Sequence, residues 1–84
     1  MKVRLDPDAK RVLLALLASP KTPGEISRIH GLPIAVVWQK IQWLMEIGIV
    51  RETLSFLTST GEFRRYFEAD LPTDTADQEI VVEA

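Results

Sequence analysis

Apolar residues recur at helical spacing in the first half of the chain and predict three helices. The first runs from about residue 6 to 18, with an apolar stripe of Val12, Leu13, Leu16 and Leu17. A short second helix spans about 22–30. The third runs from about 33 to 47, and its predicted buried face carries Val37, Ile41, Leu44 and Ile47.

Local signals mark where these helices begin and end. Asp6 is suited to cap the first helix, and Thr22 with Glu25 forms the pattern of a reciprocal capping box at the start of the second. Gly31 and Gly48 follow the second and third segments, where a glycine commonly ends a helix. We therefore expect three separate helices joined by short turns.

After Gly48 the pattern changes to one typical of strands. Residues 49–57 and 62–71 are rich in β-branched and aromatic side chains, and Ser59-Thr60-Gly61 lies between them, which predicts a hairpin. A turn at Thr60-Gly61 would place opposite one another Leu54 and Phe67, Phe56 and Arg65, and Thr58 and Phe63. One face would then be packed, with Leu54, Phe56, Phe63 and Phe67. The other would be wet, with Thr53, Ser55, Leu57, Arg64, Tyr66 and Glu68.

Composition adds few constraints. A chain of 84 residues, with 46% hydrophobic and 26% charged residues, suits one small globular domain. The net charge of −2 is unevenly spread: all 10 Lys and Arg lie in residues 1–70, with 8 of the 12 acids, whereas the last fourteen residues carry four acids and no base. We therefore divide the chain into a domain over residues 1–71 and an acidic tail over 72–84. The tail could be disordered, a short helix or a strand that contacts another chain.

The order of elements resembles a winged helix-turn-helix, mainly α with a two-stranded β wing (α+β). The resemblance is to ArsR-like and MarR-like transcription regulators. It rests on Thr22-Pro23-x-Glu25-Ile26-Ser27-x-x-x-Gly31-Leu32-Pro33, on Gly48-Ile49-Val50, and on Gly61-x-x-Arg64-Arg65-Tyr66-Phe67. It implies that the third helix (about 33–47) is a recognition helix and that residues 56–66 form the wing. Double-stranded DNA is then the expected partner, and a homodimer the expected state, with Trp43, the first helix or the tail at its interface.

For DNA binding, the candidate residues fall into two groups. Gln39 and Gln42 suit base edges in the major groove, flanked by Ile34, Val36 and Trp38. Four cations are candidates for the phosphate backbone or the minor groove: Arg28, Lys40, Arg64 and Arg65. A structural alternative for Arg65 is packing of its stem over Phe56.

A second interpretation concerns protein contact. Ile34, Val36 and Trp38 form an apolar front where a DNA reader usually carries polar side chains, and such a front suits a protein partner equally well. Trp43 could be a half-buried edge of the core or a dimer contact. An RNA partner is the weakest alternative, because Tyr66 is the one exposed aromatic residue expected on the hairpin's wet face.

The sequence contains no pattern typical of an enzyme. It has no cysteine, a single histidine (His30), no glycine-rich phosphate loop and no nucleophile paired with a base. We therefore expect no catalytic residues, no metal and no cofactor. The longest apolar run, residues 12–18, is too short for a membrane span, and Asp6 and Asp8 interrupt a possible signal peptide, so we expect a cytoplasmic protein without a membrane partner.

Overall fold

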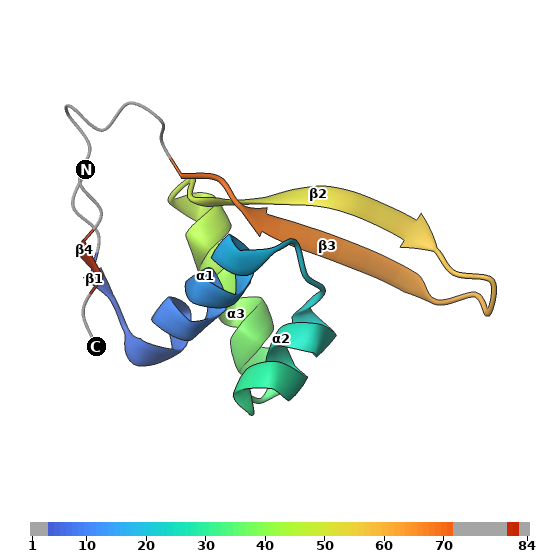
Figure 1. Ribbon diagram of the computed structural model, residues 1–84, viewed down its shortest axis with the longest axis horizontal. Coiled ribbons are helices and arrows are strands. Elements are labelled where there is room, and N and C mark those ends of the chain that lie inside the picture. Colours follow the sequence, from blue (N-terminus) through green and yellow to red (C-terminus); the bar gives the residue numbers. More distant parts are fainter. Residues whose placement is uncertain (1–3, 72–80, 83–84) are drawn as a thin grey trace.

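The computed structural model of this chain describes residues 4–71 and 81–82. The elements follow in the order β1 (Arg4–Leu5), α1 (Pro7–Ala18), α2 (Pro23–His30), α3 (Ile34–Glu46), β2 (Val50–Leu57), β3 (Phe63–Ala69) and β4 (Val81–Val82). β2 and β3 form an antiparallel hairpin, called the wing below. Three helices followed by this two-stranded hairpin confirm the predicted α+β fold class (Figure 1).

The helix ends lie where the local signals place them. Asp6 caps α1, because its Oδ1 accepts from the Ala9 N–H at 2.7 Å. Thr22 and Glu25 form the predicted capping box at the start of α2. Gly31 ends α2 with φ +66, in the left-handed region that a residue without a Cβ adopts readily. The short turn that follows is tied by Ser27, whose Oγ donates to the Leu32 carbonyl at 2.6 Å.

The core is formed by all three helices and the base of the wing. Its largest fully buried side chains are Phe67, Leu5, Ile26, Ile41, Leu44, Ile49, Val12 and Val37. Most of the predicted apolar positions are confirmed, but Leu17 is exposed and Ile47 is only half-buried. Trp43 is half-buried against this core, which fits its interpretation as a core edge.

The predicted register of the wing is wrong by one residue. Leu54 lies opposite Tyr66, Phe56 opposite Arg64 and Leu57 opposite Phe63. The cause is the loop: the Gly61 N–H donates to the Thr58 carbonyl at 3.0 Å, and the Thr58 N–H donates to the Glu62 carbonyl at 2.7 Å. Three residues, 59–61, therefore lie between the paired Thr58 and Glu62, instead of the two residues of the expected turn. An irregularity between Glu52 and Leu54 shifts the register once more toward the base.

This slip changes which side chains share a face. Phe67 lies opposite Glu52, while Leu54 and Phe56 lie on the other face, where Phe56 stacks on Tyr66 with centroids 5.8 Å apart. The expectation of one packed and one wet face is therefore also wrong. Of the wing's strand residues, only Val50 and Phe67 are buried. Figure 1 shows that the outer part of the hairpin extends beyond the helices, where no helix lies beside it.

At the opposite end of the structure, β1 and β4 pair in parallel (Figure 1). Arg4 lies opposite Val81 and Leu5 opposite Val82. Part of the predicted acidic tail is thus a strand paired with the chain's own N-terminal segment. The rest of that tail, residues 72–80 and 83–84, lies outside the described residues.

Candidate functional site: the groove between the helices and the wing

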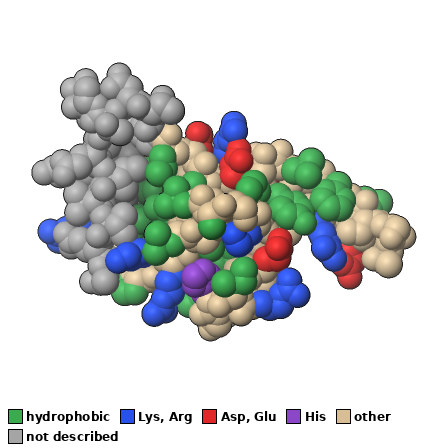
Figure 2. Space-filling view, viewed as in Figure 1, with side chains coloured by type: hydrophobic (Ala, Val, Ile, Leu, Met, Phe, Trp, Pro, Cys, Tyr) green, Lys and Arg blue, Asp and Glu red, His purple; other side chains and the backbone are tan. Residues whose placement is uncertain are grey.

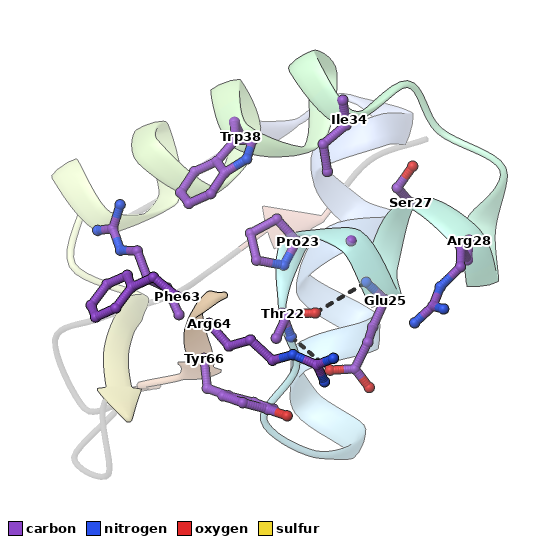
Figure 3. A pocket seen from close by; sticks show the side chains of 12 residues that line it. Thr22, Pro23, Glu25, Ser27, Arg28, Ile34, Trp38, Phe63, Arg64 and Tyr66 are labelled. Atoms are coloured by element: carbon purple, nitrogen blue, oxygen red, sulfur yellow. Dashed lines mark hydrogen bonds between the residues drawn. The ribbon is translucent and has the colours of Figure 1, made fainter. Parts of the chain in front are cut away.

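A groove of about 660 Å³ separates the wing from the helices (Figure 3). Its lining comes from the start of α2 (Thr22, Pro23, Gly24, Glu25, Ser27, Arg28), from α3 (Ile34, Trp38) and from β3 (Phe63, Arg64, Arg65, Tyr66). The groove thus brings together five of the nine predicted site residues: Arg28, Ile34, Trp38, Arg64 and Arg65. Phe63 and Tyr66 were not predicted as site residues, although Tyr66 shares the predicted wet face with Arg64.

The capping box of α2 lies at one end of the groove. Thr22 Oγ1 accepts from the Glu25 N–H at 3.2 Å, and Glu25 Oε1 accepts from the Thr22 N–H at 3.0 Å (Figure 3, dashed lines). The first N–H groups of α2 are therefore partly used within the chain. A phosphate at this helix start would also meet the Glu25 carboxylate, so the positive charge of the groove must come from its arginines.

Arg65 is held tightly at the base of the wing. Its Nε and Nη2 donate to the two carboxylate oxygens of Glu52, at 2.9 and 3.0 Å. The guanidinium carbon also lies 5.2 Å from the Trp38 ring centroid and 5.4 Å from that of Phe67. The Trp38 and Phe67 rings meet edge to face, with centroids 5.7 Å apart. Arg65 thus packs on Trp38 and Phe67, and the expected alternative, packing over Phe56, is not formed.

This contact shifts the ionisation of both partners. Hydrogen bonds from Arg65, and secondarily from the Ser55 hydroxyl, lower the pKa of Glu52 to about 2. The same hydrogen bond from Arg65 to Glu52 raises the pKa of Arg65. The pair therefore stays ionised in neutral and mildly acidic solution. Its geometry gives Arg65 a positioning role: it fastens the wing to α3.

Arg64 and Arg28 are the more accessible cations of the groove. The Arg64 side chain is 51% exposed, and its Nη2 lies 3.7 Å from Glu62 Oε2, a loose pair in water. The Arg28 side chain is exposed and forms no ion pair within residues 4–71. These two arginines can reach an anionic ligand without breaking a close contact.

Lys40 is engaged elsewhere. Its Nζ lies 2.7 Å from Asp6 Oδ2, so it joins α3 to the start of α1, and it does not line the groove. The hydrogen bond from Lys40, followed by that from the Ala9 N–H, lowers the pKa of Asp6. A phosphate contact by Lys40 would therefore compete with its interhelical ion pair.

The side chains of α3 do not form the expected single apolar front. Ile34 and Trp38, four positions apart, share the side that faces the groove and are 46% and 38% exposed. Val36 is half-buried and absent from the groove, because two residues along a helix turn a side chain by about 200°. Gln39 and Gln42 are exposed, and Gln42 also borders a smaller hollow of about 250 Å³ beside Trp38 and Met45.

The charges of the wing cancel. Its three arginines each have an acidic neighbour: Arg51 with Glu68 at 2.6 Å, Arg64 with Glu62 at 3.7 Å and Arg65 with Glu52 at 2.9 Å. Hydrophobic side chains are exposed along the wing in Figure 2, among these charges. The wing therefore offers little net positive field to a distant phosphate.

Comparisons with protein-family models, with curated proteins and with solved structures found no match to this chain.

Among the described residues, no three His, Asp or Glu side chains gather as they would around a metal ion. None of the helices in residues 4–71 is both long and apolar enough to cross a bilayer.

Proposed function

We propose that this chain binds double-stranded DNA as a small cytoplasmic transcriptional regulator of winged-helix type. The observation that carries the proposal is the position of α3. It follows α2 through a tight turn at Gly31, its Gln39 and Gln42 side chains are exposed, and its Ile34 and Trp38 side chains face the wing across the groove.

In this proposal the exposed amides of α3 contact base edges. A glutamine amide can both donate to and accept from adenine in the major groove, so Gln39 and Gln42 are the candidate readers. Arg28 and Arg64 contact phosphates from the two sides of the groove. Lys40 and Arg65 support the site indirectly, since each holds one neighbouring element against α3.

The charge pattern determines how this binding depends on salt. Because each phosphate neutralised contributes about −0.9 to the slope of log K against log salt, two available arginines give a slope of about −2 per chain. This is a shallow dependence for a DNA-binding protein. A single chain is therefore a weak binder, and two copies acting together on one site would raise the affinity.

The face of α3 that meets DNA can be tested by adding negative charge to it. In a fluorescence anisotropy titration of mixed-sequence duplex DNA, Gln39→Glu/Gln42→Glu reduces affinity at least tenfold through repulsion of the phosphates. The matched control is Leu14→Glu/Leu17→Glu, which adds the same charge at two exposed positions of α1. If both double variants lose affinity equally, α3 is not the binding face.

The exposed apolar residues of the groove favour a second candidate function, docking of a protein partner. Ile34, Trp38 and Phe63 are 46%, 38% and 64% exposed and lie on the two sides of the groove. Ile34 is the better probe, since Trp38 also packs on Phe67 and its loss would loosen the wing. Absence of DNA binding at low salt, together with a partner whose binding is lost in Ile34→Lys, would replace the DNA proposal with this one.

A further inference from the structure

The outer edge of the wing is open along β2. Within the described residues β2 pairs with β3 alone, whereas the far edge of β3 is partly covered by Lys21. The Lys21 N–H donates to the Phe67 carbonyl at 3.0 Å, and the Phe67 N–H donates to the Lys21 carbonyl at 2.9 Å. Every β2 side chain except Val50 is exposed. An exposed strand of eight residues is a ready template for another strand.

The composition of this edge suits an uncharged, apolar strand. Residues 53–61 contain no charged side chain, and Leu54, Phe56 and Leu57 are 55%, 39% and 67% exposed. The charged residues of the wing are already matched within the chain, as described above. The edge therefore presents backbone hydrogen-bonding groups and apolar side chains, without a charge that a partner would have to neutralise.

We propose that β2 pairs antiparallel with β2 of a second copy of this chain, about a twofold axis at Ser55. In this register Leu54 lies opposite the partner's Phe56, and the symmetry forms the same pair twice. The residues that pair about this axis within β2, 53–57, carry no charged side chain, so no like charges meet. The strand thus complements itself in side-chain size and in charge.

The pairing is also expected to stabilise the hairpin, which has only two strands in the single chain. A two-stranded hairpin that projects into water is marginally stable, and joining two of them gives a four-stranded sheet. Within it, Tyr66, Leu54 and the partner's Phe56 lie side by side across three strands, extending the stack that Phe56 already makes on Tyr66.

The proposed interface is separate from the groove. The wing residues that line the groove all come from β3, and none comes from β2. Dimerisation through β2 therefore leaves α3, Arg28 and Arg64 accessible in both copies. The dimer does not depend on the proposed DNA function, and each can fail without the other.

The experiment is sedimentation velocity over a wide range of protein concentrations. It compares the wild type with variants that carry two lysines or two glutamates at positions 54 and 56. The wild type is expected to form a dimer. Leu54→Lys/Phe56→Lys and Leu54→Glu/Phe56→Glu each oppose like charges twice, so each is expected to raise the dimer dissociation constant at least tenfold. Mixed together, the two variants are expected to form a 1:1 heterodimer, since opposite charges then meet at both pairs.

Separate controls test whether the variants fold and whether the loss of the dimer is specific to β2. Leu54 and Phe56 are exposed in the single chain, so circular dichroism is expected to show native helix content in both variants. Leu14→Lys, which changes an exposed side chain of α1, is expected to dimerise like the wild type. The proposal is overturned by a wild type that stays monomeric, which would leave the edge to a strand of a different protein. It is also overturned by loss of the dimer in Leu14→Lys, or by lysine and glutamate variants that fail to combine.

Discussion

The Arg65 guanidinium lies over the Trp38 indole, with its carbon 5.2 Å from the ring centroid, and this contact joins the wing to α3. Glu52 fixes the guanidinium from the side through two hydrogen bonds. Arg65, one of the four cations that the sequence offers as a DNA contact, therefore connects two elements of the fold.

Glu52→Gln tests this fastening through its pH dependence. The pKa of Glu52 is lowered from its ordinary 4.5 to about 2, so its contribution to stability is present above about pH 4.5 and is lost as the pH falls toward 2. Glu52→Gln is expected to have a lower Tm than the wild type at pH 7, and the difference is expected to vanish near pH 2. Thermal unfolding of both proteins across this range measures it. Equal Tm values at pH 7 would show that the pair contributes nothing.

Phe67→Ala probes the base of the wing. Phe67 is fully buried and touches both Trp38 and Arg65, so its truncation is expected to reduce the free energy of unfolding by about 3–5 kcal/mol. Phe63→Ala is the matched control. Its ring is 64% exposed, and the loss is expected to stay within about 0.5 kcal/mol. Urea denaturation compares the two, and similar losses would contradict the packing described here.

Thr22→Ala removes one half of the capping box at α2. The Glu25 N–H loses its acceptor, and the free energy of unfolding is expected to fall by about 1 kcal/mol. Ser59→Ala, at an exposed position of the wing loop, is expected to leave stability unchanged. A Thr22→Ala protein as stable as the wild type would show that the capping box is not formed in solution.

Features set by neighbouring residues could be predicted from the sequence. The caps at Asp6 and Thr22, the end of α2 at Gly31 and the location of the hairpin all depend on contacts within a few positions. The register of the hairpin could not be predicted in this way. Two-residue and three-residue loops both fit Ser59-Thr60-Gly61, and the choice moves every later side chain to the opposite face.

The candidate site depends on that register, and so its details were not available from the sequence. Arg65 and Glu52 are thirteen positions apart, and they meet only because the observed pairing and the irregularity next to Glu52 place both on the Phe67 face. Lys40 and Asp6, 34 positions apart, likewise meet only after α1 packs on α3. Gln39 and Gln42, in contrast, are exposed as helical periodicity predicts.

Arg65→Ala separates the fastening role from a phosphate contact. Loss of the guanidinium is expected to lower the Tm and to change the emission of Trp38, because the ring loses the cation above it. The salt slope of DNA binding is expected to stay within experimental error of the wild type. A slope that becomes less negative by about one would mean that Arg65 neutralises a phosphate after all.

The most direct test of the account is the salt dependence of binding to duplex DNA, measured by fluorescence anisotropy for the wild type and for Arg28→Ala/Arg64→Ala. Weak binding is expected for the wild type, with a slope of log K against log salt of about −2 per chain, and a slope near zero is expected for the double variant. Arg11→Ala, which changes an exposed arginine on α1, should keep the wild-type slope. Absence of binding at low salt, or a slope unchanged in Arg28→Ala/Arg64→Ala, would contradict the claim that this groove and α3 bind DNA.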